Sequence, residues 1–403
     1  QELFAIPRMP FEFSDHLIGL HASQLPVDDG TLQIGIGALA EALSYSLILR
    51  HERNDLYRQL LGRLHSNPMG PPISHEPFRA GLYGMSEMVM DSFMHLRIAG
   101  ILTREVQNKK SPHPRYLHGG FFLGSKPFYA WLKGLSEKDR RGISMTRISK
   151  INDLYDEDEA AVRAQRKNAR FFNSTMQVSL LGEALSDTLQ DGRVISGVGG
   201  QYNFVAMSRE LPDAYSTLLL RSTWHDGKRR RSNIVMHGGH VTIPRHLRDI
   251  VITEYGIANL RGKTDQECVQ ALIGIADAEF QDELLAQAKK ALKVSATWRI
   301  PEIARRNTPA NLREFLAQAR ALDAGLYPDY PFGSDFTPVE QRILPALAKL
   351  KSAGRWAKLA LMARGLRAGP FAEEMARMEL KQPNSFEARL NKLALMGALA
   401  AER

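Results

Sequence analysis

The stretch TLQIGIGALAEAL (residues 31–43) decides the fold class. Its first residues form an apolar run that is typical of a buried strand, and its last residues have the apolar spacing of an amphipathic helix. Between them, Gly35 and Gly37 keep side chains away from the backbone amides at the start of the helix. Such a turn either binds the phosphate of a ligand or only connects the strand to the helix. Both interpretations make the stretch a strand–turn–helix unit.

The rest of the chain continues this alternation. Apolar runs predict further strands at residues 119–125, 171–182, 193–199, 216–223, 233–239 and 249–256, and amphipathic spacing predicts helices at residues 38–64, 87–99, 126–135, 264–276 and 277–292. The charged segment 149–170 is interpreted as a solvated helix with an acidic start and a basic end, which suits the helix dipole. Because the predicted strands are almost continuously apolar, we expect an α/β fold with a mostly parallel sheet flanked by helices.

A change in composition near residue 336 divides the chain. Residues 1–30 are irregular and proline-containing, and they are interpreted as a linker-like segment. Residues 31–335 form the predicted α/β domain. Residues 336–403 are rich in Ala, Leu, Arg and Lys and are predicted to form a C-terminal helical tail. The apolar and basic faces of this tail fit either an interface with another molecule or a packed helical cap.

The bulk composition narrows the class of protein. The 403 residues, with 44% hydrophobic and 24% charged side chains, have the balance of a soluble globular protein. The single cysteine, Cys268, cannot form an internal disulfide, which fits the cytoplasm. No apolar stretch is long enough to span a membrane, so no membrane partner is expected. The net charge is +9, and the positive excess is spread along the chain, with two local concentrations at residues 226–232 and 351–403. Because no zinc or nucleic-acid-binding pattern accompanies this charge, we expect an anionic small ligand, no metal and no nucleic acid.

Three further stretches contain groups with catalytic potential. In GMSEMVMD, Glu87 lies among methionines and is either a helix N-terminal cap or a desolvated nucleophile. In SGVGGQYNF, the amides of Gly199 and Gly200 can form a nest for an anion or for the oxyanion of an acyl transfer. In ITEYGIANLRG, Glu254 follows a strong strand and either pairs with Arg261 or acts in catalysis.

In consistent order, five segments within residues 1–335 resemble the acetyl-CoA hydrolase/CoA-transferase family, the class I CoA-transferases of the 4-hydroxybutyrate and succinyl-CoA:acetate types. The segments are LQIGIGALAEAL, GMSEMVMD, FNSTMQVSLLGE, SGVGGQYNF and VITEYGIANLRGKTDQECVQALIGIADAEF. The resemblance implies a CoA-transferase-type catalytic domain at residues 31–335, CoA as part of the substrate, an acyl-CoA and a small carboxylate as partners, and a homodimer. It covers the catalytic half of the family, so an N-terminal domain is expected to be missing from this chain.

The resemblance also assigns roles to residues. It implies that Glu87 attacks an acyl-CoA to give an anhydride and then a glutamyl-CoA thioester, which a carboxylate resolves in a transferase and water resolves in a hydrolase. The other implied catalytic residues are Asn173, which orients the reacting carbonyl, Gly199 and Gly200, which donate to the oxyanion, and Glu254, which is a second carboxylate. The implied CoA contacts are Gly35, Ile36, Gly37, Ala38, Leu39, Ser196, Gly200 and His225.

Three positions depart from the pattern of the family. Met85 stands in the place of a histidine, Asn203 in the place of an aspartate, and His225 in the place of a lysine. These departures do not affect Glu87, the first glycine loop (residues 35–39) or the second glycine loop (residues 196–200). They leave the identity of the acyl substrate undetermined. The alternative to an enzyme is a non-catalytic module that binds CoA or acyl-CoA.

Overall fold

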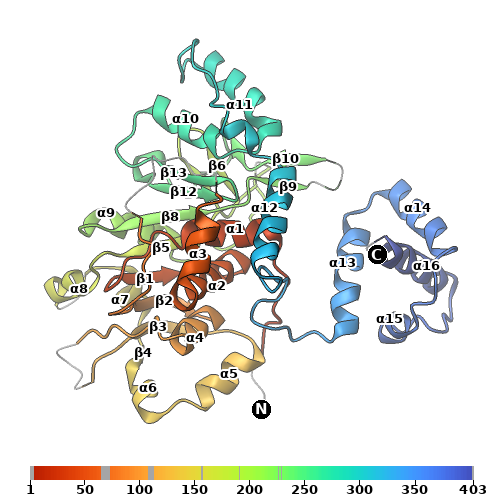
Figure 1. Cartoon of the computed structure of the whole chain (residues 1–403), viewed down its shortest axis with the longest axis horizontal. Coiled ribbons are helices and arrows are strands. Elements are labelled where there is room, and N and C mark those ends of the chain that lie inside the picture. The colour runs from red at the N-terminus through yellow and green to blue at the C-terminus, as the bar shows by residue number, and fades with distance from the viewer. Residues whose placement is uncertain are drawn as a thin grey trace. The chain divides into compact units, whose positions relative to one another are not determined.

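The computed structural model of the chain describes residues 4–64, 73–107, 113–155, 158–189, 191–225, 227 and 229–401 (Figure 1). The chain divides into two compact units, one formed by Gln1–Thr223 with Ser232–Pro331 and the other by Trp224–Arg231 with Phe332–Arg403. The domain boundaries expected from the sequence stay predictions. Among the described residues, no helix has both the length and the apolar character needed to cross a bilayer.

An eight-stranded sheet forms the centre of the first unit, in the order β13-β12-β8-β5-β1-β2-β3-β4. Every neighbouring pair is parallel except β12 and β13. The strands are β1 (Thr31–Ile34), β2 (Tyr83–Val89), β3 (Leu117–Phe122), β4 (Ile143–Met145), β5 (Arg170–Ser174), β8 (Tyr215–Leu219), β12 (Ile250–Thr253) and β13 (Gly256–Asn259). The predicted fold class, a mostly parallel sheet flanked by helices, is therefore confirmed.

Helices cover both faces of this sheet because successive side chains of a buried strand point in opposite directions. On β5, Phe172 packs into a cluster with Ile18 of α1 (Phe13–Ala22) and Leu43 of α2 (Ala38–Glu52). Its neighbour Phe171 packs into a separate cluster with Phe204 of α9 (Gln201–Glu210). The strands are buried between these two layers, which explains their continuous apolar sequence.

The other elements of the first unit surround these layers. They are α3 (Asn54–Leu61), α4 (Asp91–Ile98), α5 (Lys126–Lys133), α6 (Glu137–Gly142), α7 (Ile148–Asn152), α8 (Glu159–Gln165), α10 (Asp265–Gly274), α11 (Ala278–Lys290) and α12 (Pro309–Leu322), with the short helices η1 (Arg245–Leu247) and η2 (Ala304–Arg306). A second sheet joins β11 (Ile234–Val235), β6 (Gln177–Ser179) and β7 (Ala184–Leu185). A two-stranded sheet joins β9 (Thr223–His225) and β10 (Arg230–Ser232), most of whose residues belong to the second unit.

The second unit contains four helices, α13 (Pro338–Ser352), α14 (Arg355–Gly365), α15 (Ala372–Arg377) and α16 (Phe386–Ala400), within its described residues. Its core includes Ala346, Phe371 and Leu395. Helices α14 and α16 approach closely at two glycines. A Cβ atom at Gly365 would lie 2.0 Å from a backbone oxygen of α16, and one at Gly397 would lie 1.8 Å from a backbone oxygen of α14. The glycines therefore set the distance between these helices.

Several predicted elements differ from the observed ones. The single helix predicted at residues 38–64 is two helices, because Arg53 leaves the helical conformation with φ −130° and ψ 54°. The strand predicted at residues 193–199 is an exposed loop in which Val194 forms an isolated bridge to Thr188. The solvated helix predicted at residues 149–170 is also wrong, since α7 and α8 occupy separate parts of that segment and Ile151 is fully buried.

Candidate functional site

Three predicted site residues meet at the carboxyl ends of neighbouring strands. β1 lies between β2 and β5, with Thr31 opposite Tyr83 on one side and Leu32 opposite Arg170 on the other. Continuing both registers to the ends of the strands brings Glu87 and Asn173 level with Gly35, on either side of it. Ligand sites of open parallel sheets lie at this edge. The structure therefore brings the first glycine loop, the predicted nucleophile and the predicted asparagine together.

The carboxylate of Glu87 is held by two neutral N–H donors. The backbone N–H of Gly200 donates to Oε2 over 2.9 Å, and the side-chain amide of Asn152 donates to Oε1 over 2.5 Å. Gly200 directly precedes α9, so the carboxylate lies at the N-terminus of a helix, where the helix dipole favours negative charge. Glu87 itself lies within β2, and α4 begins four residues later at Asp91. The interpretation of Glu87 as a helix cap is therefore wrong, and the helix predicted at residues 87–99 is present but begins only at Asp91.

The glycines of the second glycine loop allow the carboxylate of Glu87 to approach the backbone of Gly200 closely. A Cβ atom at Gly200 would lie 2.0 Å from Oε1 of Glu87. Gly199 has φ +57°, in the left-handed region that side chains disfavour. Any residue larger than glycine at position 200 would therefore displace the carboxylate, and the backbone turn at position 199 favours glycine.

Asn152 was not predicted from the sequence. It ends α7, a short helix that Ile151 anchors in the same apolar cluster as Met85 of β2. The many charges of residues 149–170 concealed this anchoring. The available signal was the spacing of Ile148 and Ile151, which are three residues apart and therefore lie on one side of a helical turn.

The first glycine loop has an open face. The N–H of Gly35 donates to the carbonyl oxygen of Phe172 over 2.8 Å, which fixes the end of β1. Gly37 caps α2 with φ +91°, and a Cβ atom there would meet nothing within 4 Å. Ile36 is exposed, while Ala38 and Leu39, in the first turn of α2, are half-buried. The N-terminus of α2 is therefore left open beside Gly37, and ligand binding by this loop stays a prediction.

Asn173 is buried and already has a partner. Its side-chain amide and that of Gln33 on β1 exchange two hydrogen bonds of 3.3 and 3.4 Å. Gln33 is a second residue that was not predicted from the sequence. An amide nitrogen carries two hydrogens, so Asn173 keeps one donor beyond the bond to Gln33. A Cβ atom at Gly35 would lie 3.8 Å from Oδ1 of Asn173, which places this amide directly beside the first loop.

Glu254 lies away from Glu87. It follows β12, and β8, β5 and β1 separate β12 from β2. Four strand spacings correspond to about 19 Å. The carboxylate of Glu254 accepts hydrogen bonds from the N–H and the hydroxyl of Ser222, at 2.8 and 2.6 Å, while burial raises its pKa. Arg261 pairs with Asp249 instead of Glu254, with Nε donating over 2.9 Å. The structure brings neither predicted partner, Glu87 or Arg261, to Glu254.

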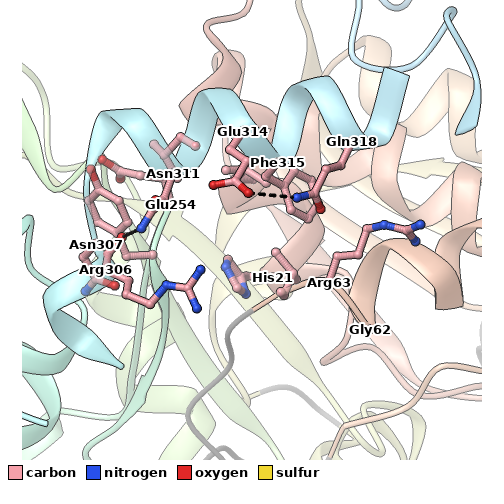
Figure 2. Close-up of a pocket in the computed structure, with 14 residues that line it drawn as sticks. His21, Gly62, Arg63, Glu254, Arg306, Asn307, Asn311, Glu314, Phe315 and Gln318 are labelled. Atoms are coloured by element: carbon pink, nitrogen blue, oxygen red, sulfur yellow. Dashed lines mark hydrogen bonds between the residues drawn. The ribbon is translucent and has the colours of Figure 1, made fainter. Parts of the chain in front are cut away.

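Glu254 instead lines a cavity of about 320 Å³ between α1, the residues that follow α3, the turn after β12, and α12. Figure 2 shows it there with His21, Arg306, Asn311 and Phe315. Burial lowers the pKa of His21 to about 4, so this ring is neutral at physiological pH. The role of Glu254 as a second carboxylate beside Glu87 stays a prediction that this placement does not support.

The remaining predicted residues lie on exposed segments. Ser196 belongs to the loop before Gly199, and its hydroxyl donates to the carbonyl oxygen of Gly197 over 3.2 Å. His225 ends β9 in the second unit, and its Nδ1 accepts a bond from the N–H of Gly227. Asn203 is exposed in the first turn of α9. Within the part of the chain that the structure describes, no group of three or more His, Cys, Asp or Glu side chains is placed to hold a metal ion.

Comparisons with known proteins identify relatives of this chain. Residues 124–288 match the model of the acetyl-CoA hydrolase/transferase C-terminal domain. The chain is 30% identical over 274 residues to the 4-hydroxybutyrate coenzyme A transferase of Clostridium kluyveri, a match that covers 68% of this chain and 54% of that protein. It is 26% identical over 277 residues to the butyryl-CoA:acetate CoA-transferase of Anaerostipes caccae, covering 68% of this chain and 52% of that one. The chain thus spans about half the length of the curated relatives it matches.

Solved structures share the fold. RipA from Yersinia pestis matches with a TM-score of 0.56 and 24% identity, covering 73% of this chain and 56% of RipA. The 4-hydroxybutyrate CoA-transferase from Porphyromonas gingivalis matches with a TM-score of 0.51 and 22% identity, covering 72% and 58%. These structures confirm the fold, and the sequence matches confirm the resemblance seen in the sequence motifs. The chain contains, at residues 124–288, a C-terminal domain of the acetyl-CoA hydrolase/transferase family, and it is a relative of the 4-hydroxybutyrate and succinyl-CoA:acetate CoA-transferases.

Proposed function

We propose that this protein transfers CoA between an acyl-CoA and a carboxylate, or hydrolyses acyl-CoA, through a glutamyl-CoA thioester on Glu87. The observation that carries the proposal is the position of the Glu87 carboxylate. Its two oxygens accept hydrogen bonds from Asn152 and Gly200, at the sheet edge beside an open glycine loop. A carboxylate in this position can act as a nucleophile, and the N–H donors can stabilise charge that develops on its oxygens.

The proposed reaction passes through two covalent intermediates on Glu87, an anhydride and a thioester. One oxygen of Glu87 attacks the thioester carbonyl of the acyl-CoA, and the tetrahedral intermediate expels the CoA thiolate to leave an acyl-glutamyl anhydride. The thiolate then attacks the glutamyl carbonyl of this anhydride and expels the acyl group as a free carboxylate. The product is the glutamyl-CoA thioester. A second carboxylate takes the CoA by the reverse sequence in a transferase, whereas water releases CoA and restores Glu87 in a hydrolase.

The contacts of Glu87 support the second of these steps. When the thiolate attacks the glutamyl carbonyl, the negative charge develops on an oxygen of Glu87 itself. Asn152 and Gly200 already donate to the two Glu87 oxygens, so a donor is in place without reorganisation whichever oxygen carries the charge. A donor in such a position contributes about 3 kcal/mol to lowering the barrier.

The surfaces around Glu87 suit a long anionic substrate. The loop from Gly35 to Leu39 would bind part of CoA with its amides, and Ser196 would add a polar contact. The CoA contact expected of His225 rests on the resemblance to the family alone. Ile36 and Val198, on the two glycine loops, are 52% and 39% exposed, and Tyr202, in the first turn of α9, is 47% exposed. These side chains would contact the apolar parts of an acyl-CoA. Asn173 would orient the reacting carbonyl with the N–H that Gln33 leaves free.

The names of the relatives indicate which substrates this proposal involves. The relatives are named for butyryl, succinyl and 4-hydroxybutyrate groups, which are short acyl chains. We therefore infer a short-chain acyl-CoA and a small carboxylate for this chain. A homodimer and a further domain preceding this chain remain expectations that rest on the resemblance to the family.

Mass spectrometry of the protein incubated with acetyl-CoA tests the proposal. We expect a CoA adduct on the peptide that contains Glu87, and we expect borohydride to inactivate the loaded protein by reducing the thioester. Glu87→Gln should give no adduct. Adding labelled acetate separates the two reactions, because a transferase incorporates the label into acetyl-CoA while a hydrolase only consumes the thioester.

The alternative, a non-catalytic CoA-binding module, predicts a different result. This alternative is motivated by departures from the pattern of the family, such as His225 in the place of a lysine. Binding of CoA without an adduct, with identical behaviour of the parent protein and Glu87→Gln, would establish that alternative and eliminate the covalent mechanism.

A further inference from the structure

The outer side of α14 presents large apolar side chains to solvent. Trp356 is 84% exposed, Leu359 is 54% exposed and Leu366, directly after the helix, is 72% exposed. Successive helical residues are about 100° apart, so these three positions and exposed Ala363 fall on one side of the helix. We call these four residues the α14 ridge, which is about 15 Å long. A contiguous exposed apolar surface of this kind marks a site of interaction.

The opposite side of α14 is already covered. Leu361 packs partly buried against the core of the second unit, and Gly365 is buried against α16. The side chain of Arg364 donates to the carbonyl oxygen of Ala400 at the end of α16 over 2.7 Å. The helix is therefore held by one side on its own unit, and the ridge is the side that remains uncovered.

The charge around the ridge is entirely positive. The helix and the two residues after it contain Arg355, Lys358, Arg364 and Arg367 and no acidic residue. Within the described part of the chain, Arg355, Lys358 and Arg367 make no side-chain hydrogen bond or ion pair. Three acidic side chains of the same unit have other partners, since Glu340 pairs with Arg377, and Glu373 and Glu374 pair with Arg342. Among the described contacts, neither Glu379 nor Glu387 forms an ion pair with the cations of α14. The ridge therefore has an uncompensated cationic border.

We propose that the α14 ridge is a docking surface for an anionic lipid bilayer. Trp356 would lie at the level of the headgroups, the leucines would enter the outer part of the acyl region, and the cations would face the lipid phosphates. A bilayer surface accommodates a protruding helix of this length, whereas a protein partner needs an apolar groove of matching shape with an acidic rim. The contact is with the membrane surface, since α14 is far too short to span it. It does not depend on the activity proposed for Glu87.

Vesicle flotation tests this proposal. The protein is mixed with vesicles of phosphatidylcholine containing about one third phosphatidylserine, and with vesicles of phosphatidylcholine alone. We expect binding to the anionic vesicles, weakened by added salt because the charges are exposed. The triple variant Arg355→Gln, Lys358→Gln, Arg367→Gln should bind about a hundredfold more weakly, at about fivefold per cation.

A second variant separates the apolar contribution. Trp356→Ser with Leu359→Ser should reduce binding about tenfold or more while leaving the charge unchanged. Leu292→Ser is the matched control, because Leu292 is 91% exposed in the first unit and does not belong to the ridge. Equal binding to both kinds of vesicle, or binding that neither ridge variant weakens, would overturn the proposal. So would a molar mass in solution that falls to the monomer in the ridge variants, because a second copy of the chain would then cover the ridge.

Discussion

Removing the side-chain amide of Asn152 should slow formation of the glutamyl-CoA thioester and leave acyl-CoA binding unchanged. In the structure this amide donates to Oε1 of Glu87 over 2.5 Å. In the anhydride the glutamyl oxygen is a neutral carbonyl, and in the following transition state it carries negative charge. Because a hydrogen bond to a charged oxygen is stronger than one to a neutral oxygen, Asn152 stabilises the transition state more than the anhydride. A difference of about 3 kcal/mol, the contribution of one such donor, corresponds to a rate about 150-fold lower in Asn152→Ala.

Rapid-quench mass spectrometry of the Glu87 peptide, alongside KM and kcat, measures this effect. We expect the rate of adduct formation and kcat to fall together in Asn152→Ala while KM changes little. Asn391→Ala is the matched control, because Asn391 is an exposed asparagine on α16. Thermal unfolding of both variants should differ from the parent by about 1 kcal/mol or less, since neither truncation removes a buried apolar group. Unchanged adduct formation in Asn152→Ala would refute the reasoning, and a raised KM with unchanged kcat would assign Asn152 to binding alone.

Three further changes give separate tests. In Gly200→Ala, a Cβ atom 2.0 Å from Oε1 of Glu87 should displace the carboxylate and lower kcat about a hundredfold or more, and a variant with full activity would disprove the contact. Burial raises the pKa of Glu41 from its usual 4.5 to about 7, so the folded protein retains a proton that the unfolded chain releases. The free energy of unfolding should therefore fall by about 3 kcal/mol from about pH 4.5 to about pH 7, and denaturant titrations of Glu41→Gln should lack this fall. Arg8→Met leaves the buried carboxylate of Asp91 without its 2.6 Å partner and should cost about 3 to 5 kcal/mol in thermal unfolding, and a smaller loss would show that solvent reaches the pair.

Part of the site followed from sequence because local patterns determine it. The strand before Gly35 and the helix after it fix the first loop, and the glycines at positions 199 and 200 indicated either a turn or a nest for an approaching anionic group. The structure supplies that group as the carboxylate of Glu87. Close approach to a backbone amide excludes side chains, and this exclusion is visible in a sequence.

The position of Glu254 could not be predicted in the same way. Both Glu87 and Glu254 lie at the carboxyl ends of parallel strands, and alternation of strands and helices places all such ends on one edge. Alternation does not give the order of the strands along that edge. The observed order puts β8, β5 and β1 between β12 and β2, so the strands that carry the two carboxylates are about 19 Å apart.

The helical tail shows a related limit. Apolar spacing in residues 355–366 predicts a helix but does not say which side another helix covers. Leu361 and Leu359 are equally apolar in sequence, yet one packs against its own unit and the other is 54% exposed. Which side of α14 is buried depends on Gly365 and Gly397, because these glycines allow α14 and α16 to pack closely along that side. The exposure of the α14 ridge therefore follows from tertiary packing and could not be predicted from the periodicity of apolar residues.

The absence of a cation beside Glu87 is consistent with the proposed chemistry. Within the described residues the carboxylate is bound by two neutral N–H groups, one on α7 and one at the start of α9, and forms no ion pair. A lysine or arginine there would stabilise the resting carboxylate strongly and would lose much of its interaction once the group became an uncharged anhydride or thioester. Neutral donors bind the anion less tightly and can still bind a carbonyl oxygen, so they can remain in place through every intermediate. Replacing Asn152 by lysine should therefore lower kcat further than replacing it by alanine, and the order of these two variants separates stabilisation of the transition state from stabilisation of the resting carboxylate.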